Sequence, residues 1–194
     1  VYKRQVLMSV EDIDASVEAV TASGGKIMTP PTDLQSRGRI AVISDVEGAL
    51  LGLLETRDGD PRDDEPEVDG FLWDELWTSD VESADAFYTK VSGLTRDTVD
   101  IDGRQDTAPT YSLLKAGDKP RAGIMPNPLE GLDPVWVSYI RVEDPAAITS
   151  RVAALGGRVI VEAGPRPIGG EVAFVAGPSG AGIALQTWPL DENN

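Results

Sequence analysis

The chain repeats itself, and this internal repeat limits the folds open to it more than any other feature of the sequence. A displacement of 132 residues places Val10-Glu11-Asp12 on Val142-Glu143-Asp144. About a dozen identities then align over roughly 45 residues without a gap. A displacement of 64 residues gives a weaker match that sets Asp80 on Asp144. The sequence therefore predicts three copies of one structural module.

Each copy has the same local pattern. Asp12, Asp80 and Asp144 each follow a short apolar run with the residue types of a β-strand. Each aspartate precedes apolar residues at helical spacing, which is typical of a helix N-cap. Glycines suited to the left-handed position beyond a helix end follow at Gly24, Gly93 and Gly156. Three further strand-like runs complete the second and third copies, of which the last is expected over residues 183–188. The module is predicted to be β-α-β-β-β, and the fold class α+β.

A charged, proline-bearing stretch separates the first copy from the second. Residues 58–69 read Asp-Gly-Asp-Pro-Arg-Asp-Asp-Glu-Pro-Glu-Val-Asp, which is typical of a linker. We therefore expect one unit at residues 1–57, an acidic linker at residues 58–69 and a second unit at residues 70–190.

Charge and composition exclude several classes of function. The chain has 33 acidic and 17 basic residues, a net charge of -16, and neither histidine nor cysteine. So negative a surface repels phosphate backbones and anionic lipids, so we expect neither a nucleic-acid partner nor a membrane partner. The sequence contains no thiol nucleophile and no catalytic triad that uses histidine. With no apolar run of membrane-spanning length and no signal-peptide pattern at the N-terminus, a cytoplasmic location is the default expectation.

The tandem βαβββ pattern resembles the vicinal oxygen chelate superfamily, which includes glyoxalase I, bleomycin-resistance proteins and extradiol dioxygenases. The resemblance depends on Trp73-Asp74-Glu75-Leu76, on the helix with Phe87-Tyr88 and on Gly177-Pro178-Ser179-Gly180-Ala181 before the last strand. It implies that modules pair and that their mixed sheet curls into a cup, here formed by residues 70–190. Fold alone does not assign function.

Three modules leave one without a partner. Residues 70–190 supply a complete pair, whereas residues 1–57 supply only the second half of another pair, which would expose a sheet edge and a sheet face. We expect that the sequence is an N-terminally truncated piece of a four-module protein. The competing interpretation is a homodimer that completes the half-domain.

Glu75 is the candidate catalytic residue. Strand alternation places it on one face with Trp73 and Trp77. A carboxylate between two tryptophans would be desolvated, and it could then act as a general base or bind a ligand's amine. The alternative is a structural role, in which Glu75 bonds neighbouring groups and holds the strands together.

Aromatic and polar side chains on the same strands are candidate ligand contacts. Aromatic walls suit planar or cationic ligands, although each ring could instead be ordinary core. Arg141 could pair with an anionic ligand or lie in solvent. The candidate ligand-binding residues are Trp73, Trp77, Tyr139, Arg141, Gln186 and Trp188.

The resemblance also implies where a metal would bind. Metal-dependent members place histidine or glutamine seven residues before the capping aspartate and glutamate in the last strand of each module. The matching positions are Trp73, Val137 and Ala184, and a fourth near residues 123–125, so we expect no metal and no cofactor. The predicted function is a metal-free cup that binds a small aromatic or amphipathic molecule, as in resistance-type members. The alternative is a metal-dependent lyase, isomerase or dioxygenase of the glyoxalase type.

Overall fold

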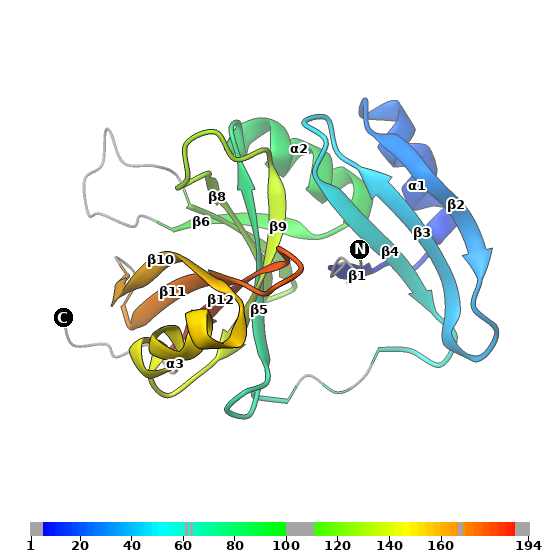
Figure 1. Ribbon diagram of the computed structural model, residues 1–194. Helices are drawn as coiled ribbons and strands as arrows, with labels where there is room; N and C mark the ends of the chain where they lie inside the picture. Colours follow the sequence, from blue (N-terminus) through cyan, green and yellow to red (C-terminus); the bar gives the residue numbers. More distant parts are fainter. Residues whose placement is uncertain (1–5, 61, 63, 100–110, 167–168, 189–194) are drawn as a thin grey trace.

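The computed structural model describes residues 6–60, 62, 64–99, 111–166 and 169–188, and it arranges them in two β-sheets (Figure 1). The first sheet is formed by the first copy of the repeat and has the strand order β1-β4-β3-β2, in which only β1 and β4 are parallel. Its elements are β1 (Leu7–Ser9), α1 (Ile13–Ala22), β2 (Lys26–Asp33), β3 (Gly38–Ser44) and β4 (Leu50–Thr56), with a 3-10 turn at Gln35–Arg37.

The second sheet is formed by the second and third copies and has the strand order β10-β11-β12-β9-β5-β8-β7-β6. The second copy contains β5 (Phe71–Thr78), α2 (Val81–Ser92), β6 (Thr95–Val99), β7 (Tyr111–Ala116) and β8 (Lys119–Pro126). The third contains β9 (Val135–Arg141), α3 (Pro145–Val152), a 3-10 turn at Ala153–Leu155, β10 (Arg158–Pro165), β11 (Glu171–Ala176) and β12 (Gly182–Gln186). The first strands of the two copies, β5 and β9, pair antiparallel at the centre and join the two halves.

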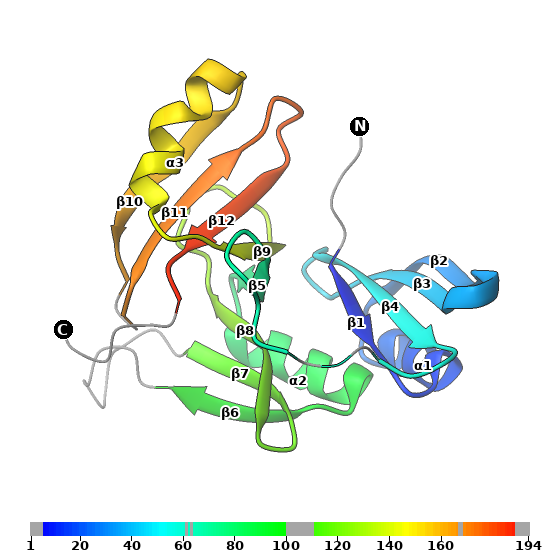
Figure 2. The ribbon, with the colours of Figure 1, turned by 90° about the horizontal axis from the view of Figure 1, so that it is seen from below.

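The second sheet curls, so that its two halves face each other across a concave inner face (Figure 2). On the outer face, α2 contacts β7 and β8, and α3 contacts β10 and β11. The predicted α+β class, with tandem βαβββ modules in a curled mixed sheet, is confirmed. We call the curled sheet the cup, as in the sequence analysis.

The predicted helix ends are also confirmed. The carboxylates of Asp12, Asp80 and Asp144 each accept hydrogen bonds of 2.9–3.0 Å from backbone N–H groups in the first turn of the helix that follows. Beyond α2 and the 3-10 turn after α3, Gly93 and Gly156 adopt φ values of 72° and 77°, a conformation that glycine accepts without the Cβ penalty.

The last strand is shorter than the sequence pattern suggests. β12 ends at Gln186, the last of its residues to pair with both β9 and β11. Thr187 donates its N–H to the carbonyl oxygen of Glu171, and pairing with β9 has stopped by then. The prediction that Trp188 continues this strand is therefore wrong, and its side chain is 38% exposed.

The first sheet packs on the outer side of α2 through a buried chain of hydrogen bonds. The Tyr88 hydroxyl, on α2, donates to Asp45 at 2.9 Å and accepts from the Trp136 indole N–H at 3.0 Å. All three residues are buried, and the Tyr88 and Trp136 rings meet edge to face at 5.2 Å. Side chains of both sheets share this core, among them Ile43 and Leu53 of the first sheet. Trp136 is thus a core residue.

The other side of the first sheet is less covered. β1 is the terminal strand of the described sheet. Three apolar side chains remain substantially exposed, Leu7 at 41%, Leu50 at 40% and Met28 at 57%. The expected exposed edge and face of the first module are therefore present. None of the described helices has the length and apolar composition needed to cross a membrane.

Candidate functional site

Glu75 is the centre of a hydrogen-bond network on the inner face of the cup. It lies in the middle of β5, and its side chain is completely buried. One carboxylate oxygen accepts from the Tyr111 hydroxyl at 2.6 Å, and the other accepts from the Trp77 indole N–H at 3.0 Å and from the Tyr139 hydroxyl. These donors come from β7, β5 and β9, so the network joins both halves of the sheet.

Arg166 completes this network from the opposite wall. It follows β10 in a tight turn, in which its backbone N–H donates to Gly170 and its carbonyl oxygen accepts from Gly169. One terminal nitrogen of the guanidinium lies 2.6 Å from Glu75, and the other donates to the Gln186 side-chain oxygen at 2.7 Å. The guanidinium also lies 5.1 Å from the centre of the Tyr139 ring. A buried ion pair therefore spans the two modules of the cup.

The electrostatics of this network favour one protonation state. Burial raises the pKa of Tyr111 and of Tyr139 above its ordinary value of 10.0, and the charge of Glu75 raises both further. Burial opposes the charged form of Arg166, but the Glu75 carboxylate that accepts its hydrogen bond acts in the other direction, and the pKa of Arg166 is raised. Both tyrosines are therefore neutral donors at neutral pH, and Arg166 stays a cation.

A glycine makes room for the network. Gly123 on β8 pairs with Glu75 across the sheet. A Cβ at this position would lie 2.1 Å from the Tyr111 hydroxyl oxygen and 3.1 Å from the Glu75 Cγ. Any other residue at position 123 would therefore displace Tyr111 from Glu75.

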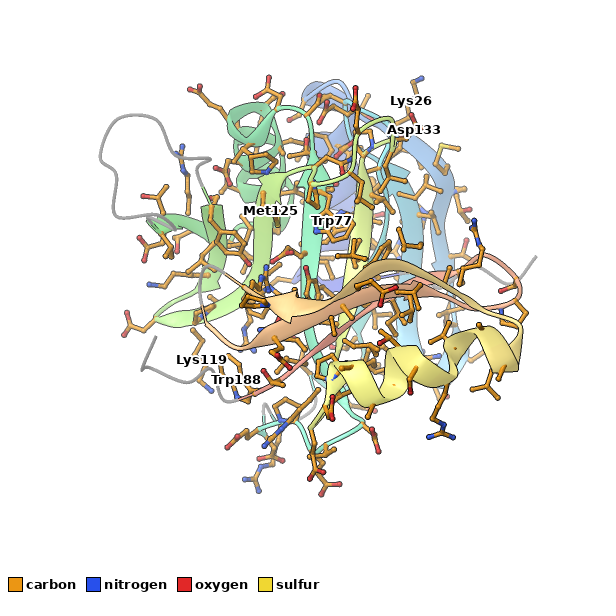
Figure 3. All side chains as sticks on the ribbon, turned by 60° about the vertical axis from the view of Figure 1, so that its left-hand side comes forward. Lys26, Trp77, Lys119, Met125, Asp133 and Trp188 are labelled. Atoms are coloured by element: carbon orange, nitrogen blue, oxygen red, sulfur yellow. The ribbon has the colours of Figure 1, made fainter. Side chains whose placement is uncertain are left out.

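Apolar side chains surround the polar centre. Trp77 and Phe174 pack edge to face with ring centres 4.9 Å apart, and the Trp73 indole N–H donates to the Tyr111 hydroxyl at 3.2 Å. Figure 3 draws Trp77 and Met125 close together over the cup. The partly buried members of this cluster are Leu72, Trp73, Met125, Leu129, Val135, Val161 and Val172. The inner face thus combines partly exposed apolar walls with one polar network, in which the Glu75 carboxylate accepts four hydrogen bonds.

Five of the seven predicted site residues lie together. Glu75, Trp77 and Tyr139 are in direct contact, Gln186 joins them through Arg166, and Trp73 joins them through Tyr111. Their predicted roles, catalytic for Glu75 and ligand-binding for the others, remain predictions.

The other two predicted residues lie elsewhere. The Arg141 guanidinium donates to the Pro66 carbonyl oxygen at 2.6 Å and lies 3.3 Å from the Glu65 carboxylate, so it holds the linker. Trp188 follows the end of β12 and lies apart from Trp77 in Figure 3.

Sequence reasoning missed Tyr111 and Arg166. Arg166 sits in a stretch of glycine and proline that predicts only a hairpin turn. Only an indirect signal pointed to Arg166. Glu75 and Gln186 on an inner face need hydrogen-bond donors, and Arg166 is a cation in the turn that follows a strand of the same sheet. No local pattern distinguishes Tyr111 from an ordinary core residue.

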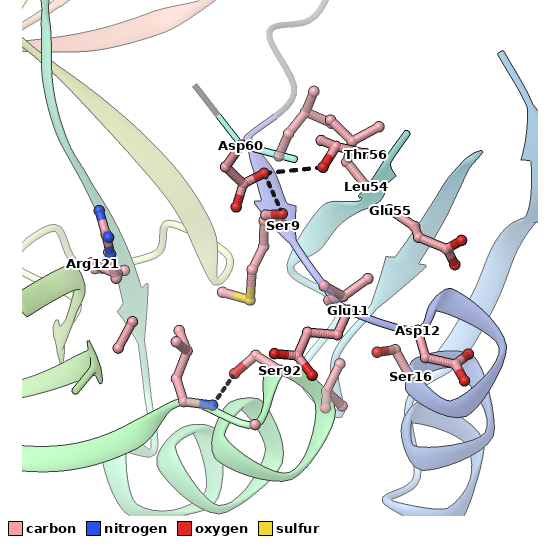
Figure 4. Close-up of a pocket in the computed structure, with 18 of the residues that line it drawn as sticks. Ser9, Glu11, Asp12, Ser16, Leu54, Glu55, Thr56, Asp60, Ser92 and Arg121 are labelled. Carbon is pink, nitrogen blue, oxygen red and sulfur yellow. Dashed lines mark hydrogen bonds between the residues drawn. The ribbon is translucent and has the colours of Figure 1, made fainter. Parts of the chain in front are cut away.

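A second concavity lies between the two sheets. It is a cleft of about 1040 Å³ bordered by β1, the end of α2 and the β7–β8 turn (Figure 4). Asp60 accepts hydrogen bonds from Ser9 and Thr56 at its rim. Its lining carries both signs of charge, including Glu11 and Lys90. This cleft lies on the opposite side of the second sheet from the Glu75 network.

Comparison with known proteins assigns the family. The profile of the Glyoxalase/Bleomycin resistance protein/Dioxygenase superfamily matches residues 70–185, nearly the whole of the second sheet. The chain belongs to this superfamily. The resemblance seen in the repeat, the opening Trp73-Asp74-Glu75-Leu76 and the last hairpin is thereby confirmed.

The chain matches named relatives over 90–93% of its length. It is 36% identical over 174 residues to "Putative glyoxylase CFP32" of Mycobacterium bovis, covering 90% of this chain and 65% of that protein. It is 30% identical over 183 residues to "Anthracycline biosynthesis protein DnrV" of Streptomyces peucetius, covering 93% and 64%. The Mn(II)-bound glyoxalase of Novosphingobium aromaticivorans has a similar fold, with a TM-score of 0.58, 17% identity, and coverage of 93% of this chain and 61% of that one. The chain thus spans slightly less than two thirds of each.

The strand register locates the fourth position at which metal-dependent members are expected to place a ligand. Ala184 on β12 pairs with Tyr139 on β9, and Tyr139 corresponds to Glu75 in the other half of the cup. Glu75 pairs in the same parallel way with Gly123 on β8. Gly123 is therefore the counterpart of Ala184, which the sequence alone places only near residues 123–125.

The side chains at these positions do not fit a metal ion. The four are Trp73, Gly123, Val137 and Ala184. Glycine, valine and alanine offer no donor atom, and the indole N–H of tryptophan donates but does not accept. Glu75, on the same face of β5 as Trp73, already accepts from four groups. Within the described ranges, no group of three or more histidine, cysteine, aspartate or glutamate side chains is placed to hold a metal.

Proposed function

We propose that the cup of residues 70–190 binds a small molecule on its inner face without a metal ion. The observation that carries this proposal is the donor set: Trp73, Gly123, Val137 and Ala184 stand where ligands to a metal would be needed. Protein side chains bind divalent metals mainly through imidazole, carboxylate or thiolate groups, and none of these four residues supplies one.

The walls of the inner face favour a flat, apolar ligand. Trp73, Phe174 and Met125 contribute aromatic or polarisable side chains around the polar centre. Two relatives are named for anthracycline biosynthesis, and anthracyclines contain fused aromatic rings. We therefore infer that the ligand is a small aromatic or amphipathic molecule.

Glu75 has a positioning role in this proposal. Its two oxygens accept four hydrogen bonds, which uses about all the lone-pair sites of a carboxylate. A carboxylate bonded in this way orients Arg166 and the two tyrosines, and it has little capacity left to take a proton from a ligand. If Glu75 were instead a catalytic base, ligand turnover would depend on it in a variant that still binds ligand.

Two measurements on the intact chain test the proposal. Elemental analysis after purification and after incubation with Mn²⁺, Zn²⁺ or Ni²⁺ should show less than stoichiometric metal. Tryptophan fluorescence should change on titration with members of a panel of aromatic compounds of one to four fused rings. Failure of every compound to bind would overturn the proposed binding function.

The second candidate is a metal-dependent lyase, isomerase or dioxygenase of the glyoxalase type. The relative named as a glyoxylase, at 36% identity, favours it. One equivalent of divalent metal bound after incubation, lost on substitution of Glu75, would favour this candidate and overturn the metal-free one.

A further inference from the structure

We propose that Arg166 makes the cup selective for aromatic ligands that carry an anionic oxygen, such as a carboxylate, a phenolate or an enolate. This inference rests on the proposed binding function and names the chemical class of its ligand. It depends on an imbalance between the two charged groups of the buried network.

The anion of the network is saturated. Oε1 of Glu75 accepts from Tyr111 and Arg166 at 2.6 Å each, and Oε2 accepts from Trp77 at 3.0 Å and from Tyr139. Three of these four donors are neutral. The carboxylate charge is therefore compensated from four directions, and a ligand amine would have to displace one of these donors.

The cation of the network is not saturated. A guanidinium has five N–H groups in a planar fork. Within the described part of the chain, Arg166 donates to two acceptors, Glu75 and Gln186. One of the two acceptors is a neutral amide oxygen. The remaining N–H groups give Arg166 the capacity to bind a further oxygen, and bonds from a guanidinium to an anion are among the stronger hydrogen bonds in proteins.

Arg166 is more exposed than the carboxylate with which it pairs. The Arg166 side chain is 10% exposed, whereas Glu75 is completely buried. The ring of Tyr139 lies beneath the guanidinium and, together with the two ionic and polar contacts, fixes its plane. Partly buried apolar side chains of the same face, including Trp73 and Met125, surround the network. A ligand with an aromatic frame can cover these side chains while its anionic oxygen meets Arg166.

The net negative charge of the chain makes a preference for anionic ligands a stringent test of Arg166. At a net charge of -16, the surface repels anions in general. A preference for an anionic ligand over its neutral isostere therefore requires a local cation, and the overall field would act against it.

The experiment compares 2-naphthoate with its uncharged isostere 2-naphthamide by isothermal titration calorimetry at neutral pH. We expect the wild-type chain to bind 2-naphthoate about tenfold or more tightly than 2-naphthamide. Arg166→Gln should abolish this preference and change 2-naphthamide affinity less than about threefold. Arg158→Gln, an exposed arginine at the start of the same hairpin, removes the same charge and should leave the preference unchanged.

Folding of each variant is checked by circular dichroism. If Arg166→Gln does not fold, Arg166→Lys replaces it, because a point charge without the planar fork should retain only part of the preference. Equal binding of both probes to the wild type, an unchanged preference in the Arg166 variant, or binding of neither probe would overturn this inference. The proposed function fails separately, if no compound of the fluorescence panel binds or if the chain binds one equivalent of divalent metal.

Discussion

Replacing Glu75 with glutamine tests the buried network most directly, because the two side chains have nearly the same shape. The change removes the negative charge beside Arg166, whose side chain is only 10% exposed. It also replaces one accepting oxygen with an NH₂ group, which then faces two donors of the network. Removing one partner of a buried ion pair costs about 3–5 kcal/mol. For a chain of this length, that loss corresponds to a melting temperature lower by on the order of 10 °C.

The second half of the experiment is the Arg166→Met variant and the double variant. Without Arg166, Glu75 keeps three donors, Tyr111, Tyr139 and Trp77. The Arg166 variant should therefore cost less than Glu75→Gln, about 1–3 kcal/mol. The double variant has no unpaired Arg166 cation. Its loss in free energy of unfolding should therefore be smaller than the sum of the two single losses by about 0.5–3 kcal/mol.

Urea unfolding followed by circular dichroism at neutral pH gives the free energy of unfolding of all four proteins. The reasoning predicts a positive coupling between the two positions. Additive costs within about 0.5 kcal/mol would refute it, as would a Glu75→Gln variant as stable as the wild type. Either result would mean that the ion pair does not hold the halves of the cup together.

Three further changes probe other parts of the structure. Gly123→Ala should destabilise the chain by about 1–3 kcal/mol in urea unfolding, because its Cβ would collide with the Tyr111 hydroxyl. Gly164→Ala, with no atom within 4 Å of its Cβ, is the matched control, and equal effects would contradict the assignment. Burial raises the pKa of Asp74 above 3.8, so the folded protein binds this proton more tightly than the unfolded chain does. The free energy of unfolding therefore falls as the pH rises through the pKa that Asp74 has in the folded protein. Asp74→Asn should therefore be more stable than the wild type at pH 7, and the gain should shrink toward pH 4; a gain independent of pH would contradict it. Tyr88→Phe removes the hydrogen bond to Asp45 and should cost about 1.5–3 kcal/mol, whereas a cost near zero would show that this bond does not hold the first sheet in place.

The repeated scaffold could be predicted from the sequence because its signals are local. The aspartates that start the helices and the glycines that end them lie at fixed offsets, and each acts on its own turn of chain. The last strand is less well predicted: it is expected to reach Trp188 but ends at Gln186. That strand ends where its parallel neighbour β9 stops pairing, which is a long-range effect.

The site was predicted less completely, for the same physical reason. Strand parity alone grouped Glu75, Trp77 and Tyr139, and the structure brings them into contact. Arg141 pairs with Gln186 of the network, yet its guanidinium is held by carbonyl and carboxylate oxygens of the linker, so strand parity does not decide what this side chain contacts. Arg166, which follows β10, reaches Glu75 because the sheet curls. No local pattern records that curvature.

The side chains on the open side of the first sheet can be compared with those at the matching positions of the cup. At the 132-residue offset, Leu7 stands for Tyr139, Leu54 for Gln186 and Leu34 for Arg166. The first module thus carries aliphatic groups where the third carries a phenol, an amide and a guanidinium. An aliphatic surface interacts through the hydrophobic effect, which scales with buried apolar area and has no preferred direction. The two matching faces of the repeat therefore differ in kind: the cup presents groups that fix the direction of a hydrogen bond, whereas the first sheet presents apolar area.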